Sequence, residues 1–584
     1  MRILGLSSFT HDGAAVILED GTIKAAIEND KIARQSTRGL PEAAIRSCLE
    51  TAGTEWNSLD LIAVATQPLR AWGRKSLLRA KLSFAAPLAS AYYGATEIGS
   101  QARQLNDLRR LRQRAVPGNI KVVAHNHHVC HAANAFYLSP FDRAVILTAD
   151  EDGDGTSTML AIGEGASIRE LRSIPFPHSL AWVYSQVTDL AGFVPHREEH
   201  KTQWLSLEGE PLYKEVFLKI LRASGGPLPH LDYSFLNRGL AKRLAFSERF
   251  YRETGLPSDP AQLSEDQRKA LASSIQEACA EVLIGLIQHL RRKHGIDRVC
   301  LSGGLFQNAV LVSSLEKVLG PDHVFVPPAP GNAGSAVGAA LLAWHQQTGS
   351  ERTQPKVNIY CGPRFNSQQI RDVLDNCKAR YSLQNTEERK LDAAIELLHA
   401  GKTLGWFQNG SEFGPRALGN RSVLASPWTP YVKENLNDFI KHREWFRPFA
   451  ISIPEEDCDR YFEASGQCRF MNSLGWSRSQ TDCPPASFLL PGNRARLHVV
   501  ERSSNPLFWR LLKRFGEQAP APMLLNTSFN LFGEPLVVTP RDALRSYFCS
   551  GLDAMIIGNF VLSKSPRPTG VQKVEALRDV GVGV

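Results

Sequence analysis

The chain has 584 residues, too many for a single hydrophobic core, so two or more domains are expected. Hydrophobic residues make up 43% of the sequence and charged residues 22%, which excludes a disordered chain. No apolar run approaches the ~20 residues of a membrane span. The net charge of +8 is a mild excess, and the ten cysteines include no C-x-x-C pair. Because the N-terminus also lacks a signal-peptide pattern, we expect free thiols and a cytoplasmic location.

The start of the chain reads as strands joined by tight turns. "RILGLSS" and "VILEDGTIKAAIE" are rich in β-forming residues, and Asp20 with Gly21 is a hairpin signal. The pattern recurs near residue 145, where the strand "AVILTAD" is followed by the turn "EDGDGTS" and the strand "TMLAIGEG". The two units predict a duplicated architecture.

A basic stretch separates these units. Between Arg70 and Arg114 lie ten Lys or Arg residues against Glu97 and Asp107. Such a stretch can attract an acidic substrate, a membrane or nucleic acid, but it is more often the solvated face of an inserted pair of helices. We favour the inserted helices.

The segment "HNHHVCHAAN" places His127 and His131 four residues apart in a predicted helix. This spacing stacks two side chains on one face, where they can share a metal ion. From these residues alone, hydrogen-bonded core histidines remain the favoured interpretation.

Further glycine turns follow a helix predicted from Ser264 to Gly295. They lie in "RVCLSGGLFQNAVL" and "APGNAGSAVGAALLAWH", and their alternation with strands and helices indicates an α/β protein. Backbone N–H groups at such turns can bind phosphates. With the two hairpins, these turns resemble the actin-like ATPase fold, which clasps a nucleotide between two lobes. The candidate nucleotide-binding residues in the turns are Asp150, Gly153, Asp154, Gly303, Gly304 and Asn308. Asp150 and Asp154 have a simpler interpretation as a solvated turn.

A polar segment divides the chain into an N-terminal domain (1–350), a linker (351–360), a C-terminal domain (361–565) and a flexible tail (566–584). In the C-terminal domain, "EFGPRALGNRS", "KHREWFRPFA" and "NTSFNLFGEP" combine guanidinium, lysine, hydroxyl and amide groups among apolar residues. Such sets suit a phosphate site, and the candidates are Arg416, Arg421, Lys441, Arg443, Arg447, Asn526, Ser528 and Asn530. Internal pairing with Glu412 or Glu444, or nucleic-acid binding, are the alternatives.

His11 and Asp12 lie in the first hairpin turn. A histidine beside a carboxylate can act as an oriented general base, although a turn aspartate more commonly caps the backbone.

Taken together, these three C-terminal segments and "ILGLSSFTHDGAA", "HHVCHAANAF" and "LSGGLFQN" resemble signature blocks of the NodU/CmcH family of O-carbamoyltransferases. The resemblance covers roughly residues 1–565. It implies an actin-like N-terminal domain similar to TsaD and a C-terminal domain similar to YrdC.

The resemblance implies a two-step reaction. Carbamoyl phosphate and ATP, with Mg²⁺, form carbamoyl-adenylate in the C-terminal domain, and the N-terminal domain passes the carbamoyl group to a small-molecule hydroxyl. Lys441, Arg443, Arg447, Ser528 and Asn530 match the nucleotide grip, with Arg416 and Arg421 as phosphate partners. His11 with Asp12 matches the catalytic base, and His127, His131 and Asn332 match a metal site for which iron(II) is implied by analogy.

The sequence departs from the family pattern in three places. Asn332 stands where the family usually has an aspartate ligand, and no His-x-Asp-Gly stretch precedes Arg496. In "EEHKTQWLSLEG", Lys201 is retained as a nucleotide-site candidate, but the neighbouring glycines of the common "EGK-x-M-G-L" are lost.

These departures leave a catalytically impaired homologue as one alternative. Carbamoyl-type modification of tRNA and an ATP-switched binding module are two others. We expect ATP, carbamoyl phosphate and a natural-product or sugar hydroxyl as partners. We expect no nucleic acid and no membrane, and a homodimer is compatible with the basic insert.

Overall fold

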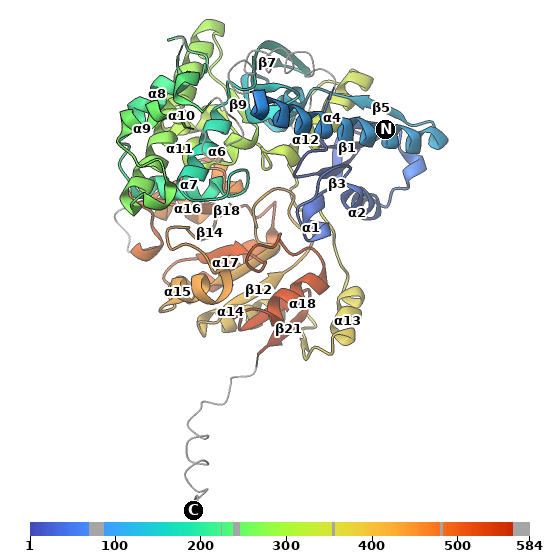
Figure 1. Ribbon diagram of the computed structural model, residues 1–584. Helices are drawn as coiled ribbons and strands as arrows, with labels where there is room; N and C mark the ends of the chain where they lie inside the picture. The colour runs from blue at the N-terminus through green and yellow to red at the C-terminus, as the bar shows by residue number, and fades with distance from the viewer. Residues whose placement is uncertain (69–86, 224, 238–245, 353–356, 479–482, 565–584) are drawn as a thin grey trace, which may run out of the picture.

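The computed structural model describes residues 1–68, 87–223, 225–237, 246–352, 357–478 and 483–564 (Figure 1). The predicted tail and parts of the predicted linker and of the basic stretch lie outside the described residues. All ten cysteines lie in the described residues, and none of them forms a disulfide, as expected.

The N-terminal domain contains two five-stranded sheets with the same topology. The orders are β3-β2-β1-β4-β5 and β10-β9-β6-β7-β8, each with two antiparallel hairpin strands followed by parallel strands. The strands are β1 (Arg2–Leu6), β2 (Ala14–Glu19), β3 (Thr22–Glu28), β4 (Leu61–Val64), β5 (Lys121–Ala124), β6 (Arg143–Gly153), β7 (Thr156–Glu164), β8 (Ser167–Pro175), β9 (Val299–Ser302) and β10 (Val324–Phe325). The predicted duplication is therefore confirmed.

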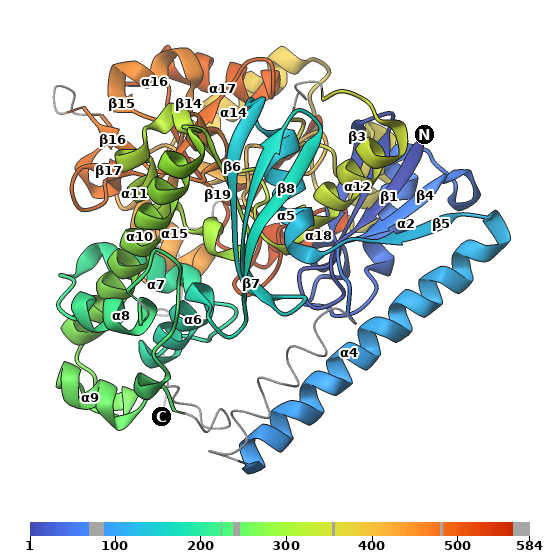
Figure 2. The same cartoon turned by 90° about the horizontal axis from the view of Figure 1, so that it is seen from above.

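Two helices fill the space between these sheets. Helix α12 packs on β1 and β2, whereas α5 packs on β6 and β9 (Figure 2). The backbones of α12 and α5 touch, because a Cβ on Gly338 of α12 would lie 1.8 Å from the carbonyl oxygen of Cys130 in α5. Strand β1 approaches α12 as closely, since a Cβ on Gly5 would lie 2.3 Å from the carbonyl oxygen of Ala336. Only glycine allows this approach.

The other helices of this domain surround the second sheet or flank the first. With α5 and α12 included, they are α1 (Asn29–Ala33), α2 (Glu42–Ala52), α4 (Pro87–Ala115), α5 (His127–Leu138), α6 (Leu180–Leu190), α7 (Glu199–Leu205), α8 (Lys214–Leu221), α9 (Glu248–Thr254), α10 (Glu265–His294), α11 (Ala309–Leu319) and α12 (Asn332–Thr348). The capping box predicted at Ser264 and the C-cap at Gly295 bound α10. This helix is long and apolar enough to cross a membrane, but 78% of its apolar window is buried, as in a core helix.

Helix α4 extends as a long rod along the outside of the domain (Figure 2). Leu108 and Leu111 face the body of the protein, while Arg109, Arg110 and Arg112 are exposed. The described half of the basic stretch is thus an amphipathic helix, as predicted.

The C-terminal domain is built on one eight-stranded mixed sheet of order β11-β21-β20-β12-β13-β19-β14-β18, with a three-stranded sheet β15-β16-β17 beside it. Its strands are β11 (Ser382–Leu383), β12 (Leu404–Phe407), β13 (Arg421–Ala425), β14 (Ala450–Pro454), β15 (Phe462–Glu463), β16 (Gly475–Ser477), β17 (Arg494–Ala495), β18 (Leu497–Val500), β19 (Leu524–Ser528), β20 (Ala554–Ile557) and β21 (Phe560–Ser563). Its helices are α13 (Ser367–Asn376), α14 (Glu387–His399), α15 (Val432–Leu436), α16 (Glu455–Tyr461), α17 (Pro506–Gly516) and α18 (Pro540–Phe548). The predicted α/β class is confirmed for both domains.

Polar contacts join the two domains. Lys31, buried after β3, pairs with Glu28 at 2.9 Å and donates to the carbonyl oxygens of Glu412 (2.9 Å) and Gly414 (2.7 Å). Glu28 in turn accepts from the backbone N–H of Gly414 at 2.7 Å. The loop that carries Arg416 is therefore held by the N-terminal domain.

Candidate active site

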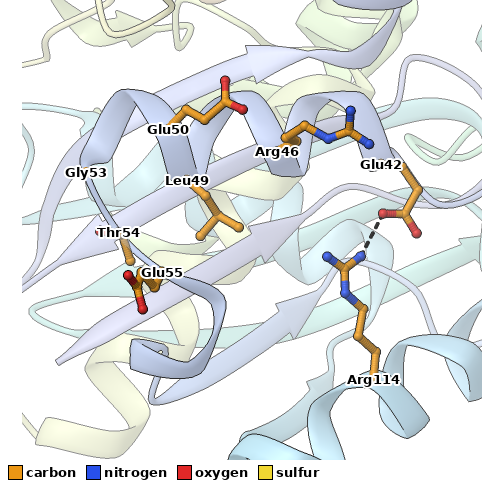
Figure 3. A pocket seen from close by; sticks show the side chains of 8 residues that line it. All are labelled: Glu42, Arg46, Leu49, Glu50, Gly53, Thr54, Glu55 and Arg114. Atoms are coloured by element: carbon orange, nitrogen blue, oxygen red, sulfur yellow. Dashed lines mark hydrogen bonds and ion pairs between the residues drawn. The ribbon is translucent and has the colours of Figure 1, made fainter.

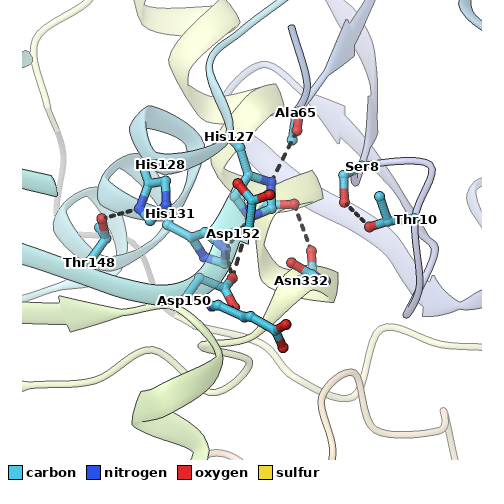
Figure 4. Close-up of polar contacts among 12 residues, drawn as sticks. Ser8, Thr10, Ala65, His127, His128, His131, Thr148, Asp150, Asp152 and Asn332 are labelled. Carbon is cyan, nitrogen blue, oxygen red and sulfur yellow. Dashed lines mark hydrogen bonds and ion pairs between the residues drawn. The ribbon is translucent and has the colours of Figure 1, made fainter. Parts of the chain in front are cut away.

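Three side chains of the N-terminal domain converge at the end of α5. His127 and His131 lie on one face of this helix, which begins at the cap Asn126, and Asp150 reaches them from β6 (Figure 4). The Nε2 atoms of the two histidines are 3.1 Å apart, and the Oδ2 atom of Asp150 lies 3.2 Å from His131 Nε2 and 3.4 Å from His127 Nε2. The predicted pair thus gains a carboxylate neighbour.

This triad has the spacing of metal ligands. Ligand atoms of a tetrahedral site with bonds of about 2.0–2.1 Å are about 3.3–3.4 Å apart, close to the separations found here. The outer ring nitrogens are oriented in the way that metal-bound histidines require. His131 Nδ1 lies 3.2 Å from Ser302 Oγ, and His127 Nδ1 lies 3.4 Å from the carbonyl oxygen of Ala65. The residues therefore fit a divalent metal.

Asp150 is the anionic member of the triad, and its hydrogen bond and charge, against the effect of burial, raise the pKa of His127. Burial alone would raise the pKa of Asp150, but hydrogen bonds from His127 and His131 hold it well below its usual range. Asp150, predicted as a nucleotide-binding residue, has its carboxylate within 3.4 Å of both histidines.

Glycines make room for the triad. A Cβ on Gly153 would lie 2.0 Å from the His127 ring, and one on Gly304 would lie 3.0 Å from Asp150 Oδ1. Gly303 adopts φ +104° beside the carbonyl oxygen of Ala149. These predicted nucleotide-loop glycines thus border the triad.

Two other predicted nucleotide residues have structural partners. Asp154 accepts from the backbone N–H groups of His127 and Gln67, each at 2.9 Å. Asn308 caps α11 and donates to Gln276 Oε1 at 2.8 Å. Both side chains organise the turns around the triad.

His11 and Asn332 form a contact beside the triad. The Nδ2 atom of Asn332 lies 3.1 Å from His11 Nε2, while its Oδ1 atom is buried without a hydrogen-bond partner. Although desolvation lowers the pKa of His11, the Asp12 carboxylate 3.0 Å away raises it to about 9. His11 therefore holds a proton at neutral pH and must lose it before it can act as a base.

The second cluster is cationic and lies in the C-terminal domain. The Nζ atom of Lys441 is 2.7 Å from Asn530 Oδ1 and 3.3 Å from Ser528 Oγ. Lys441 ends a π-helical turn, a geometry often found at functional sites. Burial, with Arg443 and Arg447 close by, lowers the pKa of Lys441 well below its usual value. Lys441, Ser528 and Asn530, predicted to act together, therefore lie in contact.

Four arginines add to this charge, and they outnumber the carboxylates beside them. Burial and the charge of Arg447 lower the pKa values of Arg416, to about 10, and of Arg443, to about 9. Arg496 was not predicted as a site residue. Burial and the charges of Arg416, Arg443 and Arg447 lower its pKa, and its buried Nε has no hydrogen-bond partner among the described residues. Glu444, 3.5 Å from Arg447, is the neighbouring carboxylate. Buried positive charges in excess of the neighbouring carboxylates favour a bound anion.

Helix α7 of the N-terminal domain reaches this cluster. Lys201 lies 2.5 Å from Glu444 Oε1, and Trp204 packs under the Arg496 guanidinium at 5.3 Å. Arg416 donates in the opposite direction, to the carbonyl oxygen of Gln307 at 3.0 Å. The anion-type site is therefore shared by both domains.

Two predicted residues serve the framework instead. Arg421 is fully buried and donates to backbone carbonyls, including those of Asn409 at 3.0 Å and Asn420 at 3.1 Å. Asn526 donates to Ser452 Oγ at 3.0 Å, next to the neutral ring of His498. Sequence alone could not distinguish these buried polar groups from ligand contacts.

Two hollows lie elsewhere. A pocket of about 490 Å³ between α2 and the end of α4 contains charges that pair internally, such as Arg114 with Glu42 at 2.8 Å (Figure 3). A larger cavity of about 870 Å³ lies between the domains, bordered by Phe141, Tyr360 and His498. Neither contains the triad or the arginine cluster.

The chain thus combines a metal-type triad in a duplicated α/β domain with a cationic site in a second α/β domain, an arrangement that suits a two-domain group-transfer enzyme. The chain belongs to the carbamoyltransferase family: residues 2–341 match the model of the carbamoyltransferase N-terminus and residues 395–564 that of the C-terminus. The predicted family and the predicted transferase class are thereby confirmed.

Three relatives show how far the similarity extends. The chain is 32% identical over 602 residues to the uncharacterized protein sll1178 of Synechocystis, covering 97% of both. It is 31% identical to nodulation protein NolNO of Sinorhizobium fredii over 96% of this chain and 80% of that one. It is also 31% identical to the 3'-hydroxymethylcephem-O-carbamoyltransferase of Amycolatopsis lactamdurans, over 40% of this chain and 43% of that enzyme.

Proposed function

We propose that this carbamoyltransferase is ATP-dependent and acts through carbamoyl-adenylate. In the C-terminal domain, carbamoyl phosphate loses phosphate to water, and the resulting carbamate attacks the α-phosphorus of ATP and expels pyrophosphate. The observation that carries this proposal is the cationic cluster of Arg416, Arg443, Arg447, Arg496 and Lys441. Its positive charges outnumber the negative charges of the carboxylates beside it. Such a cluster stabilises phosphate charge as it develops.

We further propose that transfer to the acceptor takes place at the triad. A hydroxyl of a small molecule, a natural product or sugar, attacks the carbamoyl carbonyl, and AMP leaves. His127, His131 and Asp150 would hold a divalent metal, for which iron(II) is our first choice, and it would supply Lewis acidity. His11, once deprotonated, accepts the hydroxyl proton, and Asp12 orients its ring.

The experiment separates the two half-reactions. Purified protein receives ATP, Mg²⁺ and carbamoyl phosphate without acceptor, and pyrophosphate release is followed. Lys441→Ala should abolish the release, His127→Ala should spare it, and Lys402→Ala, at an exposed lysine, should behave as wild type. Equal damage to both steps by the first two changes would refute this division of labour.

One observation favours a second candidate. Asn332 supplies a neutral amide where the family usually has a carboxylate, as in a catalytically impaired homologue that still binds ATP. Absence of pyrophosphate release by folded wild-type protein, with ATP binding retained, would support this alternative.

A further inference from the structure

Helix α7 brings one more side chain to the cationic site. Lys201 pairs with Glu444, and Trp204 stacks against Arg496, so the C-terminal domain contacts two positions of this short helix. His200 lies four residues before Trp204 and hence on the same helical face, one turn away. This face points at the arginine cluster.

The surroundings of His200 are almost entirely cationic. Among the ionisable groups that act on it, Lys201 comes from α7, whereas Arg447, Arg416 and Glu444 come from the C-terminal domain. Burial, with the charges of Arg447, Arg416 and Lys201, lowers the pKa of His200 to about 3. The imidazole is therefore neutral at physiological pH.

The ring also has no protein partner. Among the described residues, neither ring nitrogen of His200 takes part in a hydrogen bond, unlike those of His127, His128 and His131. A half-buried imidazole that neither bonds to the protein nor carries charge is poorly explained as a packing residue.

We propose that His200 binds the phosphate-bearing substrate in the cationic site and takes up a proton as the anion arrives. A neutral imidazole can donate one N–H to a phosphate oxygen. Once the anion offsets the charge of Arg416 and Arg447, the second nitrogen can be protonated, and a charged donor then faces the phosphate. The N-terminal domain thereby contributes a binding residue to the reaction proposed for its neighbour.

The charge of the site comes from the arginines and Lys441, so the imidazole of His200 adds a hydrogen-bonding group rather than charge. We infer that it adjusts anion affinity and its pH dependence, while the arginines supply the site itself.

Calorimetry with inorganic phosphate tests this inference. Binding is measured near pH 7 in two buffers of different ionisation enthalpy, which gives the number of protons taken up. His200→Ala should weaken phosphate binding by about tenfold or more, as expected for a lost bond to a charged group. His200→Gln, which keeps a neutral hydrogen-bonding group, should bind within about threefold of wild type but take up fewer protons. His289→Gln, at an exposed histidine, should match wild type in both.

The outcomes are distinct. Unchanged phosphate affinity in His200→Ala, proton uptake by His200→Gln equal to that of wild type, or no phosphate binding by wild type would each overturn the inference. Thermal melts of all variants exclude misfolding as the cause of a loss. The inference rests on the proposed phosphate site but needs no turnover. Wild-type protein that binds phosphate with the expected proton uptake, yet releases no pyrophosphate, would refute the proposed function and leave the role of His200 intact.

Discussion

Replacing Gly153 with alanine should disable the metal site without touching the cationic site. The new Cβ would lie 2.0 Å from Cδ2 of His127, whereas carbon atoms in contact are about 3.5 Å apart, so the ring must move by about 1.5 Å. Metal sites tolerate displacements of about 0.2 Å. Because the His127 ring is almost fully buried, it has no free space into which it can move.

We therefore expect Gly153→Ala to lose metal affinity by at least about 100-fold, more than the loss of an outer-shell contact would cause. Equilibrium dialysis against iron(II) or zinc, followed by elemental analysis, measures this directly. Gly466→Ala is the matched control, because nothing lies within 4 Å of its added Cβ. Acceptor-free pyrophosphate release should be unchanged. Wild-type metal affinity in Gly153→Ala would refute the assignment of His127 as a ligand.

Three further changes probe the interface and the site. Burial raises the pKa of Glu316 to about 7. This carboxylate accepts a hydrogen bond from Ser473 across the interface between the domains. Because the folded state holds the proton to higher pH than the unfolded state does, wild type should lose up to about 3 kcal/mol of stability as pH rises from 4.5 through 7. Glu316→Gln should remove this loss in melts at pH 5 and 8, and equal pH slopes would contradict it. Lys31→Met should cost about 3–5 kcal/mol by leaving Glu28 buried and unpaired, and adding Glu28→Gln should recover part of it in denaturant unfolding. Asn332→Asp should raise metal affinity by about tenfold in dialysis, since it adds a charged oxygen; unchanged affinity would place Asn332 outside the ligand set.

Local sequence signals were sufficient for the framework. Hairpin turns predicted the duplicated sheets, and the signals at Ser264 and Gly295 predicted α10. Each signal acts within a few residues, so no tertiary information is needed to recognise it.

Which side chains meet across the fold was harder to predict. Asp150 joins His127 and His131 only because β6 ends beside α5, and the sequence placed it with the nucleotide instead. Trp204 and Arg496 come together from different domains, nearly 300 residues apart, and no local pattern in the sequence predicts this contact. Buried polar residues that support the backbone, such as Arg421, have the same composition signal as ligand contacts.

The glycine-mediated contact between α5 and α12 has a consequence for motion. Where backbones touch without side chains between them, helices cannot slide past one another by small changes of rotamer, so the two sheets should move as one body. Opening that admits substrates must then occur elsewhere, and the boundary between the two domains is the remaining place for it. Substrate entry would accordingly be a hinge motion of one domain against the other, with α7 travelling away from the arginines.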